Sequence, residues 1–186
     1  MRFEERELPG LYSVIFDTVR DHRGFLAKPF EAGPFESEGF SIGWRQVIHS
    51  HTAVKNTLRG LYVQRAPFQE GKLVTSIRGK MYWVVVDVRK DSPTFGRWES
   101  TILSGDDGQA LWIERGFAHG CLSLSDHVDL LLLADNEHSD EHSVGIAWND
   151  SELGIDWPLS GSAPVISEAH AGNPSFPEFK RRYGGL

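Results

Sequence analysis

The fold is decided by two neighbouring stretches, Thr57-Leu-Arg-Gly-Leu-Tyr-Val-Gln64 and Gly71-Lys-Leu-Val74. Each contains branched or aromatic residues in a short run, which is typical of a β-strand. The residues between them are mostly polar and include a proline, as expected of a turn. We therefore predict a hairpin that brings Lys72 back beside Arg59 and Tyr62.

Three basic side chains, Arg59, Arg65 and Lys72, gather around this predicted hairpin. The whole chain has a net charge of -7, so a local group of cations indicates a binding site for an anion. The alternative is that they are ordinary surface charges beside a sheet. The hairpin taken alone is compatible with both interpretations.

The composition is that of an ordinary globular protein. The chain has 186 residues, of which 40% are hydrophobic and 24% charged, which suits one domain over residues 1–186. No apolar run approaches the roughly 20 residues of a membrane span, and the charged N-terminus does not resemble a signal peptide. We therefore expect a cytoplasmic protein without membrane contact. Its acidic balance also argues against general nucleic-acid binding.

The single cysteine, Cys121, excludes an internal disulfide and a multi-cysteine zinc site. It lies in an apolar run, so we expect an inert buried thiol and not a nucleophile. The sequence contains no supported Ser–His–Asp or Cys–His pattern, no phosphate-binding glycine loop and no dinucleotide-binding motif. A covalent hydrolase is therefore unsupported.

Short β-rich runs separated by turn residues continue along the chain, which is the pattern of an all-β sandwich or barrel. The run from Lys80 to Val88 is apolar almost throughout, so it should be buried on both faces. We expect a loop from Pro34 to Gly39, extended chain from Phe40 to His51, and a single helix from Phe176 to Tyr183. Further strands are expected at Leu11 to Phe16, Phe25 to Phe30, Trp98 to Leu103, Ala110 to Ile113, Phe117 to Leu124 and Val128 to Leu133.

Histidines provide two further candidates. His49 and His51 fall on one face of a strand, which is half of a possible metal site. A metal-binding barrel also needs a carboxylate a few residues later, and Lys55 and Asn56 occupy that stretch. The alternative is that the pair lines a pocket or faces solvent. His119 lies between small residues in an apolar strand, where a lone histidine is more often structural than catalytic.

An ordered set of motifs extends from Leu11 to Glu168. The motifs are Asp21-His-Arg-Gly24, Gln46, Leu58-Arg-Gly-Leu61 with Gln64, Gln69-Glu-Gly-Lys-Leu-Val74, Arg78-Gly79, Val86-Asp-Val-Arg-Lys90, Ser92-Pro-Thr-Phe-Gly96, Gly116-Phe-Ala-His-Gly120, Trp148-Asn-Asp150, Gly154-Ile-Asp-Trp-Pro158 and Ile166-Ser-Glu168. Together they resemble the dTDP-4-dehydrorhamnose 3,5-epimerase family. The resemblance implies an all-β fold, a cupin-type double-stranded β-helix or jelly roll, with a short helical or loop extension at the C-terminus.

The resemblance also implies an isomerase that binds a dTDP-linked nucleotide sugar in the barrel mouth of a homodimer, without a metal or other cofactor. Such an enzyme inverts carbons beside a 4-keto group by removing and returning protons, with a cation near the ketone oxygen. Arg23 and Arg59 correspond to contacts with the diphosphate and the sugar. Gln46 corresponds to a pocket amide, Lys72 to the cation near the enolate, and His119 to the pocket histidine.

The positions expected for proton transfer hold other residues. Tyr62 stands in place of the base histidine, His170 in place of its supporting aspartate, and Leu132 in place of the acid tyrosine. Lys28 replaces a pocket glutamate, and Ile48 replaces an asparagine. Leucine cannot transfer a proton, and an ordinary tyrosine is a poor base at neutral pH. Ordinary double epimerisation is therefore expected to be absent or severely slowed.

Three interpretations of the function remain. In the first, His170 assists Tyr62, and Lys72 lowers the pKa of the phenol and holds the enolate of a 4-keto-6-deoxy sugar nucleotide. His138 is then a further pocket residue, and His49, His51 and His138 are reserve proton carriers. In the second, the pocket binds a nucleotide sugar without turnover. In the third, it has moved to a different carbonyl substrate. Lys28 adds positive charge, so an anionic ligand remains favoured.

Overall fold

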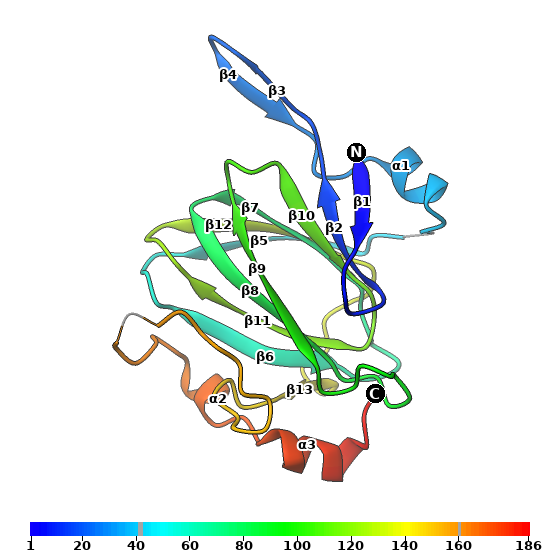
Figure 1. The fold of residues 1–186 in the computed structure, drawn as a ribbon, viewed down its shortest axis with the longest axis vertical. Coiled ribbons are helices and arrows are strands. Elements are labelled where there is room, and N and C mark those ends of the chain that lie inside the picture. The colour runs from blue at the N-terminus through cyan, green and yellow to red at the C-terminus, as the bar shows by residue number, and fades with distance from the viewer. Residues whose placement is uncertain (41–42, 160) are drawn as a thin grey trace.

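Antiparallel strands form two sheets that pack face to face (Figure 1). The structure is a computed structural model that describes residues 1–40, 43–159 and 161–186. Its strands are β1 (Arg2–Glu5), β2 (Leu11–Ile15), β3 (Thr18–Asp21), β4 (Gly24–Ala27), β5 (Gln46–Thr52), β6 (Leu58–Gln64), β7 (Lys72–Arg78), β8 (Lys80–Asp87), β9 (Trp98–Ser104), β10 (Gln109–Ile113), β11 (Phe117–Ser123), β12 (Val128–Ala134) and β13 (Ser143–Gly145). Its helices are α1 (Ala32–Ser37), α2 (Glu168–Ala171) and α3 (Phe176–Tyr183). In this described part of the chain, no helix is long and apolar enough to cross a membrane.

One sheet has the strand order β1-β2-β10-β7-β12-β5, and the other has the order β13-β6-β11-β8-β9. The prediction of an all-β jelly roll is thereby confirmed. The predicted hairpin is wrong, because β6 and β7 belong to different sheets: β6 pairs with β11 and β13, and β7 pairs with β10 and β12. From β5 to β8, and again from β10 to β13, successive strands alternate between the two sheets, so their side chains meet across the interior.

Strand β8 shows why the two layers adhere. Its alternate residues Trp83 and Val85 belong to the core between the sheets. The intervening Val84 and Val86 belong to a second cluster on the outer side of the same sheet. All four side chains are almost completely buried, as predicted for a strand that is apolar throughout.

The chain after β13 covers the outer face of the five-stranded sheet, where α2 and α3 lie at the foot of the molecule in Figure 1. Helix α3 was predicted with its observed bounds. The Ser175 hydroxyl caps its N-terminus by accepting a hydrogen bond from the Glu178 N–H. It ends at Gly184, whose φ of 68° is the left-handed conformation that favours glycine. Phe176 and Phe179 attach the helix to the sheet because both are buried there.

The other sheet is covered by an aromatic cluster from the N-terminal segment. Phe35 on α1 is buried there against Trp112, with their ring centroids 6.4 Å apart. The predicted loop from Pro34 to Gly39 is therefore wrong over most of its length, because Pro34 to Ser37 belong to α1, whose Phe35 packs on this apolar surface. Phe30 also joins the cluster and lies beyond the end of β4. The expectation that Phe176 to Tyr183 is the only helix is wrong, since α1 and α2 also form.

Two further outcomes concern the first half of the chain. The extended run predicted from Phe40 to His51 is a strand only from Gln46 onward, and residues 41–42 lie outside the described residues. Strands β3 and β4 form a two-stranded hairpin that projects from the body at the top of Figure 1. Within the described chain, neither strand pairs with one of the two large sheets.

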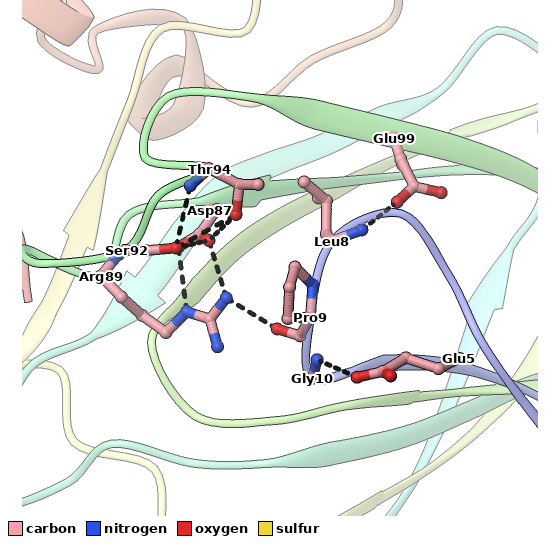
Figure 2. Close-up of polar contacts among 9 residues, drawn as sticks. All are labelled: Glu5, Leu8, Pro9, Gly10, Asp87, Arg89, Ser92, Thr94 and Glu99. Carbon is pink, nitrogen blue, oxygen red and sulfur yellow. Dashed lines mark hydrogen bonds and ion pairs between the residues drawn. The ribbon is translucent and has the colours of Figure 1, made fainter.

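A buried carboxylate fixes the loop after β8 (Figure 2). Asp87 accepts hydrogen bonds from Arg89 Nη2 at 2.7 Å, Ser92 Oγ at 2.5 Å and Thr94 Oγ1 at 2.6 Å. Arg89 Nη2 also donates to the Pro9 carbonyl at 2.7 Å, which ties the N-terminal segment to the loop. Burial alone would raise the pKa of Asp87, but these donors outweigh it and lower the pKa. The motif around Asp87 is thus explained by structure.

We predict that Asp87→Ala lowers the free energy of unfolding by about 3 kcal/mol, because it leaves the Arg89 guanidinium without its buried partner. Urea denaturation measures this change. The pKa of Asp87 is lowered in the folded state, so its stabilising effect is present above the unfolded pKa and disappears as the pH falls below about 4. Asp91→Ala, an exposed aspartate of the same loop, is the matched control. Equal effects of the two substitutions would contradict the prediction.

Candidate active site

A pocket of about 550 Å³ opens between the two sheets. Side chains from β5, β6, β7, β8, β11 and β12 form its walls, and α2 with the segment after β12 borders it. The lining residues are Ile48, Ser50, Arg59, Tyr62, Lys72, Trp83, Cys121, Leu130, Leu132, His138, Asp140, Ser143, Gly145, Ala169, His170 and Asn173. The structure therefore brings together Tyr62, Lys72 and His170, the three residues predicted to be catalytic.

A bulge in β6 aims two of these side chains into the pocket. Residues three apart on a regular strand face opposite sides, yet Arg59 and Tyr62 both line the pocket. The register between β6 and β11 shifts at this point, and Gly60 has a φ of 101°. A Cβ atom at Gly60 would lie 2.6 Å from the His119 carbonyl oxygen. Only glycine fits there, and it allows both Arg59 and Tyr62 to point inward.

Arg59 presents a positive charge to the pocket. Its Nε donates to Thr52 Oγ1 at 3.3 Å, and its Nη2 donates to the His51 carbonyl at 3.2 Å. These contacts hold the guanidinium in place without neutralising it. Within the described residues, Arg59 forms no salt bridge with a carboxylate. Arg59 therefore offers a positive charge to the pocket, and the binding of an anion there stays a prediction.

Lys72 is held in a buried ion pair at the base of the pocket. Its Nζ lies 2.5 Å from Glu70 Oε1, and both side chains are about 95% buried, with exposures of 6% and 5%. The same nitrogen lies 3.4 Å from His119 Nε2 and 5.2 Å from the ring centroid of Tyr62. Glu70 was not among the predicted site residues. The one sequence signal for Glu70 was its position two residues before Lys72 in the motif Gln69-Glu-Gly-Lys-Leu-Val74.

His119 packs behind the pocket wall. Its ring stacks on Trp83 at 5.7 Å and meets the Tyr62 ring edge to face at 4.6 Å. Burial and the charge of Lys72 lower the pKa of His119 far below its ordinary value, so the imidazole is neutral. An ammonium can only donate hydrogen bonds, so Nε2 accepts from Lys72 and Nδ1 carries the proton. His119 therefore supports Lys72 and Tyr62 from behind and is not among the residues that line the pocket.

Tyr62 and His170 meet as stacked rings, with centroids 6.0 Å apart and planes 13° from parallel. Burial raises the pKa of the Tyr62 phenol far above its ordinary value, and the negative charge of Glu70 adds to the rise while Arg59 opposes it. The expectation of a lowered pKa is therefore wrong, because burial dominates and the pKa of the phenol rises. Tyr62 is a neutral hydrogen-bond donor at physiological pH.

The imidazole of His170 is also oriented by the backbone. The Gly60 N–H donates to His170 Nδ1 at 3.3 Å, so Nε2 carries the proton in the neutral ring. Burial, reinforced by the charge of Arg59, lowers the pKa of His170, which keeps it neutral at physiological pH. Within the described chain, no hydrogen bond joins Tyr62 to His170. The predicted assistance of the phenol by this imidazole therefore remains a prediction.

Several predicted site residues lie away from this pocket. Arg23 pairs with Asp21 at 2.6 Å in the β3–β4 turn, and Lys28 pairs with Glu31 at 2.9 Å. All four side chains are outside the pocket lining of this chain. Gln46 is half-buried at the start of β5 and does not line the pocket either.

Arg65 lies outside the pocket, and His138 lies at its rim. The Arg65 guanidinium stacks over the ring of Tyr183 at 5.4 Å, outside the pocket. His138 lies at the pocket rim, where its Nε2 is 2.9 Å from Asp140 Oδ1 and both side chains are exposed.

His49 and His51 face solvent, which is one of the two alternatives to a metal site. Their ring nitrogens lie 2.9 and 2.8 Å from the same Asp129 oxygen. The described residues contain no group of three or more histidine, cysteine or acidic side chains arranged to hold a metal ion.

Trp83 is a pocket residue that the sequence analysis missed. Its side chain is 1% exposed and lines the pocket, and its indole Nε1 has no hydrogen-bond partner among the described residues. A buried donor without a partner is costly, so a ligand oxygen would be stabilised there. No local pattern distinguishes this tryptophan from a core residue, because it sits in an apolar strand.

Comparison with known proteins agrees with this geometry. A family model described as dTDP-4-dehydrorhamnose 3,5-epimerase matches residues 5–178. The dTDP-4-dehydrorhamnose 3,5-epimerase of Shigella flexneri is 38% identical over 177 residues, which cover 95% of this chain and 96% of that protein.

Solved structures show the same likeness in three dimensions. The rmlC epimerase of Mycobacterium tuberculosis superposes with a TM-score of 0.95 at 33% identity, covering 100% of this chain and 93% of that chain. A 3'-monoepimerase from Streptomyces bikiniensis in complex with dTDP-quinovose has a TM-score of 0.90 at 27% identity. This second superposition covers 97% of this chain and 90% of that one.

Cys121 provides a test of the pocket as described. Burial raises the pKa of its thiol to about 12, although Arg59 opposes the change. We expect the native protein to react with a thiol reagent such as DTNB at least about 100-fold more slowly than an unfolded peptide, because the thiolate is scarce. The protein unfolded in guanidinium is the control, and its one cysteine should then react rapidly. Equal rates in the two states would show that the thiol is ionised or exposed.

Proposed function

Because the chain belongs to the dTDP-4-dehydrorhamnose 3,5-epimerase family, a family of isomerases, we propose that it binds a dTDP-linked 4-keto-6-deoxy sugar and acts on it through an enolate. The observation that carries this proposal is the donor-rich pocket between the sheets. Arg59 brings a cation without a carboxylate partner among the described residues, and Trp83 brings an indole N–H. Diphosphate and ketone oxygens are the acceptors that such groups bind.

The pocket groups suit the stabilisation of a developing negative charge. Tyr62 is a neutral phenol, and His170 is a neutral imidazole whose Nδ1 already accepts from Gly60. Both can donate to a ketone oxygen, and Lys72 lies beside Tyr62 at the base of the pocket. Removing a proton from the neighbouring carbon places negative charge on that oxygen, where positioned donors lower the barrier most.

The residues favour proton transfer at one carbon over ordinary double epimerisation. Leu132 lines the pocket where the family resemblance places an acid tyrosine, and a leucine side chain has no proton to give. A positioned acid or base typically contributes about 10²–10⁴-fold to the rate, so the step that relies on it should be slowed by that factor. The similar Streptomyces bikiniensis protein is itself described as a 3'-monoepimerase.

We further propose a homodimer in which the β3–β4 hairpin reaches the partner's pocket. Val19, Phe25 and Leu26 on this hairpin are 67%, 54% and 60% exposed, an unusual apolar surface for two projecting strands. The hairpin also carries Arg23, which lies outside the pocket of its own chain. A second copy would cover the apolar side chains and receive this cation near its ligand.

Proton exchange tests the proposed reaction. In D₂O with a dTDP-4-keto-6-deoxy sugar, we expect deuterium to enter one carbon beside the ketone faster than the other, as followed by proton NMR. Tyr62→Phe should slow this exchange about 100-fold, because a donor to the enolate oxygen is lost. The affinity for dTDP, measured by calorimetry, should stay within about threefold.

The matched control is Tyr183→Phe, which removes a phenol oxygen outside the pocket and should leave the exchange rate unchanged. Binding of the sugar nucleotide by the wild type without exchange at either carbon would refute the proposed reaction and favour a binding-only function. Rapid exchange at both carbons would refute the preference for one site.

The dimer is tested at its apolar hairpin. We expect sedimentation to show a dimer for the wild type and a monomer for Phe25→Asp/Leu26→Asp, because two charges replace the surface that a partner would cover. The double variant should also bind dTDP more weakly, since the partner's Arg23 is withdrawn. Val54→Asp, at another exposed apolar position, is the control. A wild type that sediments as a monomer would contradict this arrangement.

A further inference from the structure

The pocket described above is rich in donors and poor in groups that can accept a proton. The Tyr62 phenol is neutral and carries its proton. His170 has its unprotonated nitrogen occupied by the Gly60 N–H, and His119 has its own occupied by Lys72. Arg59 cannot act as a base. His138, the remaining imidazole of the lining, lies exposed at the rim with its Nε2 2.9 Å from Asp140 Oδ1. An enolate cannot form unless some group takes the proton from carbon, so the acceptor must be sought elsewhere.

Two carboxylates are candidates: Asp140, which is among the lining residues, and Glu70, which contacts the lining residue Lys72. Asp140 lines the rim, but its side chain is fully exposed to water and lies beside His138. Glu70 lies at the base with an exposure of 5%, in contact with Lys72. Lys72 itself lines the pocket, so the buried pair reaches the ligand space through the lysine nitrogen.

The geometry allows the pair to exchange one proton internally. Glu70 Oε1 and Lys72 Nζ are separated by 2.5 Å, a short contact. Charged groups are costly to bury, and transfer of the proton within the pair, which leaves an amine beside a carboxylic acid, removes both charges from the interior. His119 Nε2 and the face of the Tyr62 ring, at 3.4 and 5.2 Å, keep the lysine nitrogen directed into the site.

We propose that the Glu70–Lys72 pair is the proton acceptor of this site, with Lys72 as the catalytic base and Glu70 as the residue that positions and deprotonates it. The inference rests on the proposed function and deepens it, because it names the group that forms the enolate. It replaces the expectation that Tyr62 or His170 takes this proton.

One proton moves from the Lys72 ammonium to the Glu70 carboxylate, which leaves an amine and an acid. The amine lone pair then takes the proton from the carbon beside the ketone, and the C–H electron pair forms the enolate. Lys72 is again an ammonium, Glu70 remains protonated, and the positive charge faces the enolate. Tyr62 and His170 donate to the enolate oxygen. Reversal returns a proton, or a deuteron in D₂O, to carbon.

The test compares exchange and binding in variants of the intact protein. Glu70→Gln keeps the size of the side chain and removes its charge, and Lys72→Met removes the base. Each should slow deuterium exchange into a dTDP-4-keto-6-deoxy sugar by about 100-fold or more, while the dissociation constant for dTDP changes by less than about threefold. Glu152→Gln, which breaks the exposed Glu152–Lys180 pair, is the matched control and should exchange at the wild-type rate.

A purely structural role for Glu70 is separated by chemical rescue. Added methylamine should restore exchange at least about tenfold in Lys72→Ala, and should fail in Glu70→Gln/Lys72→Ala, where no carboxylate accepts the amine's proton. Glu70→Gln can be unstable because it leaves the buried Lys72 ammonium without a charged partner. In that case the variant Glu70→Gln/Lys72→Met, in which both side chains are neutral, should fold, bind dTDP and show no exchange.

The outcomes also separate this inference from the function on which it rests. A wild type that binds the sugar nucleotide and shows no exchange overturns the proposed reaction, and this assignment with it. A wild type that exchanges normally, together with a folded Glu70→Gln variant within about fivefold of its rate, overturns only the role of Glu70. Rescue by methylamine in both Lys72→Ala and Glu70→Gln/Lys72→Ala would likewise overturn only the role of Glu70.

Discussion

The contact of Lys72 with groups from the opposite sheet is the constraint on which this site depends. Lys72 begins β7 in one sheet, and its nitrogen reaches His119 on β11 and Tyr62 on β6 in the other. A buried ammonium needs a counter-charge, which Glu70 supplies. Because this pair is neutral as a whole, Arg59 is left as the cation that faces the ligand space. In the reaction that we propose, Arg59 recruits the anion and the Glu70–Lys72 pair transfers the proton.

Family membership and pocket chemistry answer different questions here. The likeness over residues 5–178 establishes the isomerase family, and the two basic side chains that line the pocket, Arg59 and Lys72, agree with it. The groups at Tyr62, His170 and Leu132 determine what proton chemistry is available. Burial keeps Tyr62 protonated and His170 neutral, so both serve as donors. In the reaction that we propose, the pocket holds an enolate and the proton passes through a different group.

Prediction from sequence succeeded where the signal was local. The apolar run of β8 and the capped, amphipathic segment of α3 carry their own structural information within a few residues. It failed where a distant partner decided the outcome. Helix α1 forms because Phe35 packs on Trp112, far along the chain. Strands β6 and β7 look like a hairpin, yet each pairs with strands more than thirty residues away in sequence.

The sequence by itself determined the all-β class, the burial of Cys121 and the presence of Arg59, Tyr62 and Lys72 in one site, because strand composition and ordered motifs can be recognised from neighbouring residues. Only the tertiary structure decided how these side chains act. The Gly60 bulge turns Arg59 and Tyr62 to the same side, although strand periodicity opposes it. The pairing of Glu70 with Lys72 and the direction of the Tyr62 pKa follow from burial, which arises only when two sheets close over the same space.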